Sequence, residues 1–290
     1  MTEALPAAVS TVPWWIWPIA LFAVTFLLGI VAVIAGVGGG VLFVPIVGSF
    51  FPFHLDFVRG AGLLLALAGT LSAGPTLLRS GFASLRLAMP LALAGSVASI
   101  AGAVIGLALP TDIVQTALGA LVLGVGIFIW RSKSTVSTVV ESDALGELLR
   151  LKGQLHDPAE GAVDWRTHHT VLGIACFAAI GFLGGVFGLG AGFANVPALN
   201  LLMAAPLKIA VGSSSLIISI INSSAVWVYI NRGAVLPLVA APSILGVMLG
   251  ARIGARLLRS ASSSTVRRTV VIVMFVAGGR ALLRGLGIWM

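Results

Sequence analysis

Long apolar segments separated by short polar turns extend along almost the whole chain. Most of them approach the roughly 20 residues that an α-helix needs to cross the hydrocarbon core of a bilayer. The expected long helices are Ile16–Ala35, Phe57–Leu78, Leu85–Leu109, Ile113–Trp130, Val171–Phe187, Lys208–Ile230, Ala234–Leu258 and Val266–Trp289. Two further apolar segments, Val41–Phe51 and Val196–Ala205, are too short to cross by themselves. The pattern predicts an all-α polytopic membrane protein with about eight to ten membrane segments.

One long polar segment, residues 131–168, separates two apolar halves and contains six of the nine acidic residues. Within it, the leucines of Glu141–Gln154 are spaced among charged residues, which predicts a short amphipathic helix at the surface. The spacing of the histidines matches no known metal site, so we interpret them as linker residues in water. The chain is therefore divided into a first membrane repeat (1–130), a cytoplasmic linker (131–168) and a second membrane repeat (169–290).

A glycine-rich stretch interrupts the apolar pattern at the same point in both halves. Residues 36–45 read GVGGGVLFVP, and residues 188–197 read GLGAGFANVP. The alignment of these stretches continues without a gap, pairing Gly60 with Gly212 and Pro90 with Pro242 in the sequence. The two halves are therefore predicted to be homologous repeats, each with a helix broken by glycines.

The distribution of arginines predicts that the two repeats have opposite orientations. The turn between the last two long helices carries Arg252, Arg256, Arg259, Arg267 and Arg268. The matching turn of the first half has Pro110 and Asp112 instead. Because positive residues are retained on the cytoplasmic side, these equivalent turns are expected on opposite sides of the membrane. The repeats would then be inverted, with the linker in the cytoplasm, although Arg280 and Arg284 argue against this orientation.

Composition supports the membrane class and excludes several others. Hydrophobic residues make up 59% of the chain, charged residues 9%, and the mean hydropathy is +1.12, as expected for a multi-pass protein of the cell membrane. The net charge of +8 comes from basic residues at membrane ends, so nucleic-acid binding is not predicted. Cys176 is the single cysteine and lies in an apolar segment, which excludes a disulfide framework and a CxxC metal site. No cofactor is expected.

The glycine stretches are the predicted substrate-binding elements. Backbone that leaves the helix at membrane depth is stable only when it is buried in protein or lines a watery space. The short helices after each stretch begin with amide groups that attract anions, and an inverted repeat can bring two such ends to one substrate. Nearby polar side chains supply further donors. The candidate substrate-binding residues are Gly38, Gly39, Gly40, Arg59, Thr70, Gly190, Ala191, Gly192, Asn195, Ser213, Ser214, Ser215 and Asn222.

Simpler interpretations exist for several of these residues. Serines in membrane helices often form hydrogen bonds with their own helix. For Ser213–Ser215, this role and substrate binding are therefore equally expected. For Arg59, extension of the side chain to the membrane interface is favoured over anion binding. Other glycines are expected only to permit close helix packing, namely Gly95, Gly102, Gly106, Gly119 and Gly124.

In these features the chain resembles the TauE/SafE-type sulfite exporters, also described as anion permeases. The resemblance covers Gly29–Trp130 and Gly181–Leu283, and its most specific parts are the glycine stretches that close on Val44-Pro45 and Val196-Pro197. It implies transport of sulfite, sulfonates or related organosulfur anions. Where members often carry Gly-Thr-Ser, this chain has Gly60-Ala61-Gly62 and Gly212-Ser213-Ser214, and Ala191 replaces a glycine. These departures leave the exact substrate open.

The leading hypothesis is a secondary permease for a small sulfur-containing anion. The alternatives are an anion channel, which is the closest, and a carrier for other small organic anions. A carboxylate relay for protons or sodium is disfavoured, because only Asp56 and Asp112 lie in or beside the expected helices. An intramembrane enzyme would need a base or metal beside its nucleophile, and no such partner is visible. An assembly factor would be expected to carry a soluble interaction domain, and none is apparent.

Overall fold

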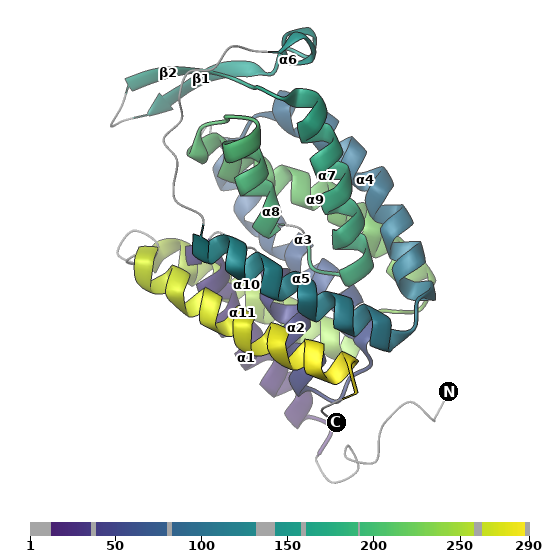
Figure 1. Cartoon of the computed structure of the whole chain (residues 1–290). Coiled ribbons are helices and arrows are strands. Elements are labelled where there is room, and N and C mark those ends of the chain that lie inside the picture. The colour runs from purple at the N-terminus through teal and green to yellow at the C-terminus, as the bar shows by residue number, and fades with distance from the viewer. Residues whose placement is uncertain are drawn as a thin grey trace.

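Each half of the chain folds into a long helix, a short helix and three further long helices (Figure 1). In this computed structural model, the structure describes residues 13–35, 39–79, 83–131, 143–157, 161–190, 192–257 and 263–287. The first half forms α1 (Ile16–Ala35), α2 (Gly39–Phe50), α3 (Leu55–Arg79), α4 (Leu85–Ala108) and α5 (Thr111–Arg131). The second half forms α7 (Thr170–Phe187), α8 (Gly192–Pro197), α9 (Leu207–Asn231), α10 (Pro237–Leu257) and α11 (Ser263–Gly285). The short helix α8 continues directly as the π-helical turn η2 (Ala198–Leu202). The helix ends lie within a few residues of those expected from the apolar pattern.

Several helices have the length and hydropathy of a membrane crossing. Among the described residues, five helices meet both criteria, namely α3, α4, α5, α7 and α9, and α1, α2 and α10 contain shorter apolar segments. Along one side of α4, the large apolar side chains Leu93, Val97, Ile100 and Val104 are exposed. An exposed apolar face of this kind suits contact with lipid. A mostly helical, polytopic membrane fold is thus confirmed, and the number of eight to ten segments remains a prediction.

The linker forms a β-hairpin that the leucine pattern did not predict. α6 covers only Ala144–Leu148, and β1 (Lys152–Asp157) pairs with β2 (Gly161–Arg166) in an antiparallel register. The helix predicted for Glu141–Gln154 is therefore wrong beyond α6, and a small sheet interrupts the otherwise helical fold. Strand preference depends on what a segment packs against, and a local pattern does not contain that information.

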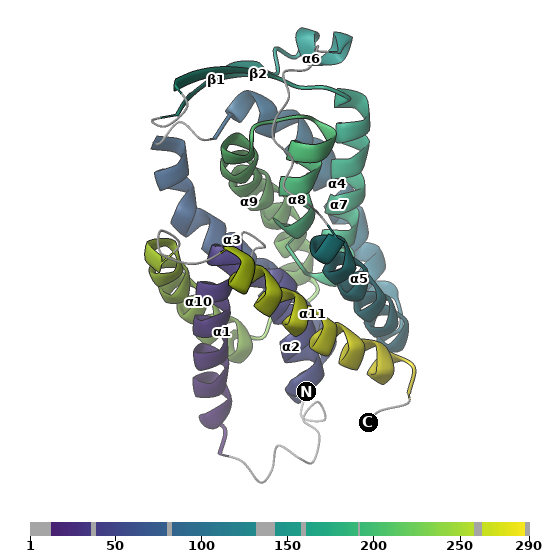
Figure 2. The same cartoon turned by 60° about the vertical axis from the view of Figure 1, so that its left-hand side comes forward.

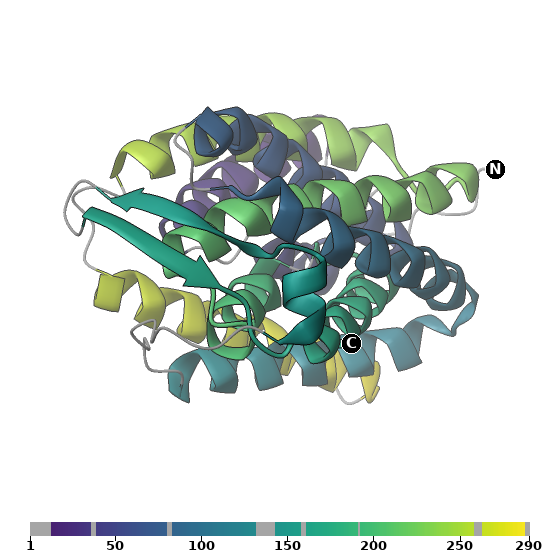
Figure 3. The ribbon, with the colours of Figure 1, turned by 90° about the horizontal axis from the view of Figure 1, so that it is seen from above.

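α6 and the hairpin lie across one end of the helix bundle (Figures 1 and 3). Leu151 and Trp165 are buried there in a cluster with residues of α4, α7 and α9. The Asp143 carboxylate accepts hydrogen bonds from the Thr170 amide (2.9 Å) and hydroxyl (2.6 Å) at the start of α7. Partial burial raises the pKa of Asp143, but these hydrogen bonds outweigh it and hold the pKa below its ordinary value. The linker is thus fastened to the second half.

Helices of the two halves pack in matching pairs. α1 packs along α10, and its counterpart α7 packs along α4, as Figure 2 shows. α3 packs on α9, and α5 packs on α11. The short helices also correspond, because α2 packs on α3 while α8 packs on α9. Exchanging the two halves therefore leaves the main packing pairs unchanged.

Glycines allow several of these helices to approach closely. A Cβ atom on Gly102 would overlap the Phe182 carbonyl oxygen of α7, and one on Gly119 would lie 2.7 Å from the Leu282 Cα of α11. The predicted packing role is confirmed for Gly95, Gly102, Gly106 and Gly119. For Gly124 it is wrong, since a Cβ there would meet nothing within 4 Å.

Candidate functional site

The beginning of the second glycine stretch, Gly188–Gly190, forms a tight turn after α7, and α8 begins at Gly192. Gly188 and Gly190 have positive φ angles of 67° and 57°, and the Gly192 amide donates a hydrogen bond to the Gly190 carbonyl (2.6 Å). A side chain in this left-handed region costs about 1–2 kcal/mol per residue. The backbone therefore favours glycine at both positions, before any contact with neighbours is considered.

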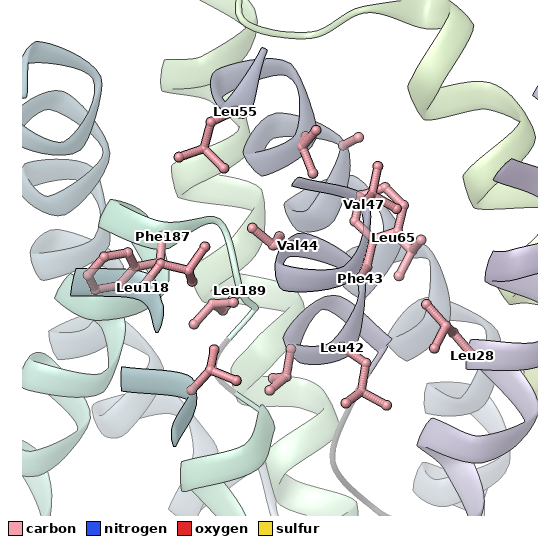
Figure 4. Packing of buried hydrophobic residues seen from close by; sticks show 14 of the residues in the cluster. Leu28, Leu42, Phe43, Val44, Val47, Leu55, Leu65, Leu118, Phe187 and Leu189 are labelled. Carbon is pink, nitrogen blue, oxygen red and sulfur yellow. The ribbon is translucent and has the colours of Figure 1, made fainter. Parts of the chain in front are cut away.

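This turn packs directly on the first half of the chain. A Cβ atom on Gly40, near the start of α2, would overlap the Leu189 carbonyl oxygen, and one on Gly62 of α3 would lie 2.6 Å from the Gly188 carbonyl oxygen. The Leu189 side chain belongs to the same buried cluster as Leu42 and Val44 of α2 (Figure 4). The two glycine-bearing segments thus meet. Of the candidate residues, Gly38 and Ala191 lie outside the described residues.

Small residues of α3 form the wall opposite the turn. Gly62, Ala66 and Thr70 follow one another at single-turn intervals. A Cβ on Gly190 would overlap the Ala66 methyl group. One turn further along, the Thr70 hydroxyl accepts a hydrogen bond from the Ser219 hydroxyl of α9 (2.9 Å). Larger side chains at Gly62 or Ala66 would hold the turn away from α3.

Two buried carboxamides lie on the helices next to the turn. Asn195 is on α8 and is 0% exposed, and Asn222 is on α9 and is 1% exposed. The Asn222 side-chain nitrogen would lie 2.9 Å from a Cβ on Gly190, so it borders the turn. Among the described residues, neither the oxygen nor the nitrogen of either carboxamide has a hydrogen-bond partner. Leaving such groups unpaired costs about 1–3 kcal/mol each, so each calls for a specific explanation.

The serine run of α9 is separated from this region. Ser213 lies more than two helical turns before Asn222, about 13 Å at a rise of about 1.5 Å per residue. The Ser213 hydroxyl accepts a hydrogen bond from the Ser84 amide at the start of α4 (3.0 Å). Ser214 is buried, and the Ser215 hydroxyl donates back to the Val211 carbonyl (3.4 Å). Ser213 and Ser215 therefore have partners within the protein.

Arg59 is buried inside the protein, so the predicted extension of its side chain to the membrane interface is wrong. It is 1% exposed. One terminal nitrogen donates hydrogen bonds to the Asp56 carboxylate (2.7 Å) and the Gly106 carbonyl (3.2 Å), and the other donates to the Val186 carbonyl. The carboxylate and the carbonyl oxygens compensate the guanidinium for its loss of water.

Tyr229 of α9 joins this arrangement, and the sequence pattern did not identify it. Its hydroxyl donates hydrogen bonds to the Gly185 carbonyl (2.9 Å) and the Val186 carbonyl (3.4 Å) at the end of α7. It is the only tyrosine of the chain. A buried phenol in an apolar helix needs a polar partner for its hydroxyl. A single tyrosine in an apolar segment therefore indicates a buried hydrogen bond, and this feature of the sequence could have identified Tyr229.

The described side chains offer hydrogen-bond donors and no metal site. Within the described ranges, no three His, Cys, Asp or Glu side chains come together closely enough to hold a metal ion. The helices that meet at the turn, α2, α3, α8 and α9, carry one carboxylate, Asp56, and it is paired with Arg59.

Comparison with known proteins identifies the family. The family model described as "Sulfite exporter TauE/SafE" matches residues 21–281. The chain is 32% identical over 120 residues to "Probable membrane transporter protein YunE" of Bacillus subtilis (strain 168), a match that covers 41% of this chain and less than half, 44%, of that relative. It is 26% identical over 272 residues to "Probable membrane transporter protein ORF9" of Sinorhizobium sp, covering 90% of this chain and 91% of the relative. No solved structure matches. The chain belongs to the TauE/SafE sulfite exporter family and is a multi-pass membrane transporter rather than an enzyme.

Proposed function

We propose that the protein is a secondary permease for a small sulfur-containing anion, such as sulfite or an organosulfonate, and that the anion binds at the turn of Gly188 and Gly190. The observation that carries the proposal is the pair of buried carboxamides, Asn195 and Asn222, whose polar atoms lack partners among the described residues. A ligand that accepts hydrogen bonds from their NH₂ groups would recover the stability lost by leaving them unpaired.

The charges of the surrounding helices favour an anion over a cation. Asp56 is the one carboxylate of α2, α3, α8 and α9 that could balance the charge of a cation at the turn, and it is already paired with Arg59. α2 begins at Gly39 beside the turn, and the start of a helix contributes about 0.3–2 kcal/mol to a nearby negative charge. An uncompensated buried ion costs several kcal/mol. The carboxamide donors are therefore needed together with the amide groups of α2.

We further propose that the two membrane repeats are inverted relative to each other. The matching pairs, α1 with α10 and α7 with α4, are expected when a pseudo-two-fold axis relates the halves, either in the membrane plane or along its normal. The unequal arginine content of the two equivalent turns favours the axis in the membrane plane. Arg280 and Arg284, which argued against the orientation, donate hydrogen bonds to the Ser49 (3.1 Å) and Gly48 (2.9 Å) carbonyls near the end of α2. Their charges thus compensate the negative end of a helix, which explains why these two arginines would lie on the external side of the membrane in the inverted arrangement.

The inverted arrangement predicts opposite accessibility for two equivalent turns. In a Cys176→Ala background, Asp112→Cys is expected to react with a membrane-impermeant thiol reagent from outside the cell. Ser263→Cys is expected to react only after the reagent gains access to the cytoplasm, because arginines surround that turn. Labelling of both positions from the same side would rule out the inverted repeat.

Transport of sulfite is expected to respond to the membrane potential. A single charge moving through 100 mV gains about 2.3 kcal/mol, which corresponds to roughly 50-fold accumulation of a monoanion at equilibrium. The measurement is uptake of labelled sulfite into proteoliposomes under an imposed potential, with protein-free liposomes as the control. Taurine, sulfoacetate, sulfate and oxalate serve as competitors.

Two outcomes of this experiment would count against the proposal. Sulfite uptake that ignores the potential would contradict charge movement with the anion. Equal competition by oxalate and by the sulfur-containing compounds would contradict selectivity for sulfur-containing anions.

A further inference from the structure

The C-terminal end of α7, which leads directly into the turn, is held by side chains of two other helices. The Gly188 amide donates to the Gly184 carbonyl (2.9 Å), which completes the helical pattern. The next two carbonyls, those of Gly185 and Val186, receive hydrogen bonds from outside α7. The Tyr229 hydroxyl donates to both carbonyls, and the Arg59 guanidinium donates to the Val186 carbonyl. Such carbonyls have no partner within their own helix.

The charge of Arg59 suits this position. The C-terminal end of a helix carries a partial negative charge, which a cation stabilises. The guanidinium also lies over the Tyr229 ring, with its central carbon 5.4 Å from the ring centre, so the two side chains support each other. The Asp56 carboxylate holds one terminal nitrogen of Arg59 from the side of α3. Of the guanidinium nitrogens, only Nε has no partner among the described residues.

The main chain of Arg59 contacts the turn as well. A Cβ atom on Gly188 would lie 2.5 Å from the Arg59 carbonyl oxygen and 2.6 Å from its Cα. The same residue therefore fixes the turn twice, through the backbone at Gly188 and through the side chain at Val186. With 1% of its surface exposed and its terminal nitrogens bonded to the protein, Arg59 is placed to orient the turn and not to contact a substrate.

The aligned residues of the first half do not supply the same side chains. In the alignment of the two repeats, Val211 corresponds to Arg59 and Leu77 corresponds to Tyr229. Neither side chain can donate a hydrogen bond to a carbonyl group. Orientation by an arginine and a tyrosine is thus a property of the second glycine stretch, the one that borders Asn222.

We infer that Arg59 and Tyr229 are positioning residues, which hold the end of α7 so that the turn of Gly188 and Gly190 presents its binding geometry. The inference rests on the proposed binding role of this turn. Loosening the turn would lower the fraction of protein that is competent to bind, and the apparent dissociation constant rises in proportion. The maximal flux would change little, because saturating substrate restores the competent state.

The test compares Tyr229→Phe with Thr25→Val. Both remove one buried hydroxyl that donates to backbone carbonyls, and the Thr25 hydroxyl does so within α1, to Leu21 (2.7 Å) and Phe22 (3.2 Å). In Tyr229→Phe, hydrogen–deuterium exchange of amides 186–190 is expected to accelerate roughly fivefold, as for one lost hydrogen bond. The KM for sulfite is expected to rise by at most the same factor at unchanged maximal flux, because a roughly fivefold larger opening constant lowers the competent fraction by no more than about fivefold. Thr25→Val should change neither quantity.

Arg59→Lys provides a second variant that keeps the positive charge. A lysine ammonium is a compact charge without the planar fork, so it cannot reach Asp56, Gly106 and Val186 together. Its effects on exchange and KM are expected to exceed those of Tyr229→Phe. Exchange needs no substrate, so unchanged exchange at 186–190 in both variants would overturn the inference whatever the protein transports. Faster exchange with an unchanged KM for sulfite would overturn it too.

Discussion

Replacing Gly190 with valine is expected to abolish transport. The residue has a φ of 57°, where a β-branched side chain is an outlier. Its Cβ would overlap the Ala66 methyl group and lie 2.9 Å from the Asn222 side-chain nitrogen. Left-handed strain of about 1–2 kcal/mol and overpacking of about 1–3 kcal/mol would together displace the turn. We expect sulfite uptake into proteoliposomes to fall at least about 100-fold, as a combined cost near 3 kcal/mol implies.

Gly124→Ala is the matched control, since a Cβ at that position meets nothing within 4 Å. Its flux and its yield of monodisperse protein in detergent should equal those of the wild type. Gly190→Ala adds the smallest possible side chain and should give a partial loss of flux with a well-folded protein. If Gly190→Ala and Gly124→Ala transport equally well, the shape of the turn does not matter for binding.

The helices could be predicted from the sequence because burial in lipid and burial in protein both require long apolar segments. α1 begins and ends at the residues expected, and in the second half Gly188 follows the end of α7 while Gly192 begins α8. The β-hairpin could not be predicted in the same way. The leucines around Glu147 suit a surface helix, whereas the observed strands depend on pairing across residues 152–166 and on the burial of Trp165.

The candidate site was only partly predictable, for a similar reason. The glycines stand out locally, and the backbone explains Gly188 and Gly190 without reference to any partner. Besides nearby Asp56, the partners of Arg59 are carbonyls on α4 and α7, far away in the sequence, so its burial could not be inferred from its neighbours. Whether a polar side chain is satisfied also depends on the tertiary structure. For this reason the sequence alone does not distinguish Ser213, which has a partner, from Asn222, which has none among the described residues.

Replacing Asn222 with leucine is expected to stabilise the protein while it impairs transport. Leucine has the same branching at Cγ but no polar atoms, so it removes a buried group whose unpaired state costs about 1–3 kcal/mol. If the Asn222 side chain donates a hydrogen bond to the anion, the KM for sulfite should rise roughly 10- to 100-fold, as for a bond to a charged group. The measurements are the thermal unfolding midpoint in detergent without substrate and the concentration dependence of uptake.

Ser243→Ala separates stability from function in the same experiment. The Ser243 hydroxyl on α10 is also fully buried and lacks a partner among the described residues, but α10 is not one of the helices that meet at the turn. Its removal should raise the unfolding midpoint and leave the KM for sulfite unchanged. Lower stability in Asn222→Leu would indicate that the carboxamide is bonded within the protein in the absence of substrate. A higher midpoint with an unchanged KM would exclude Asn222 as a ligand and leave Asn195 as the carboxamide donor to examine next.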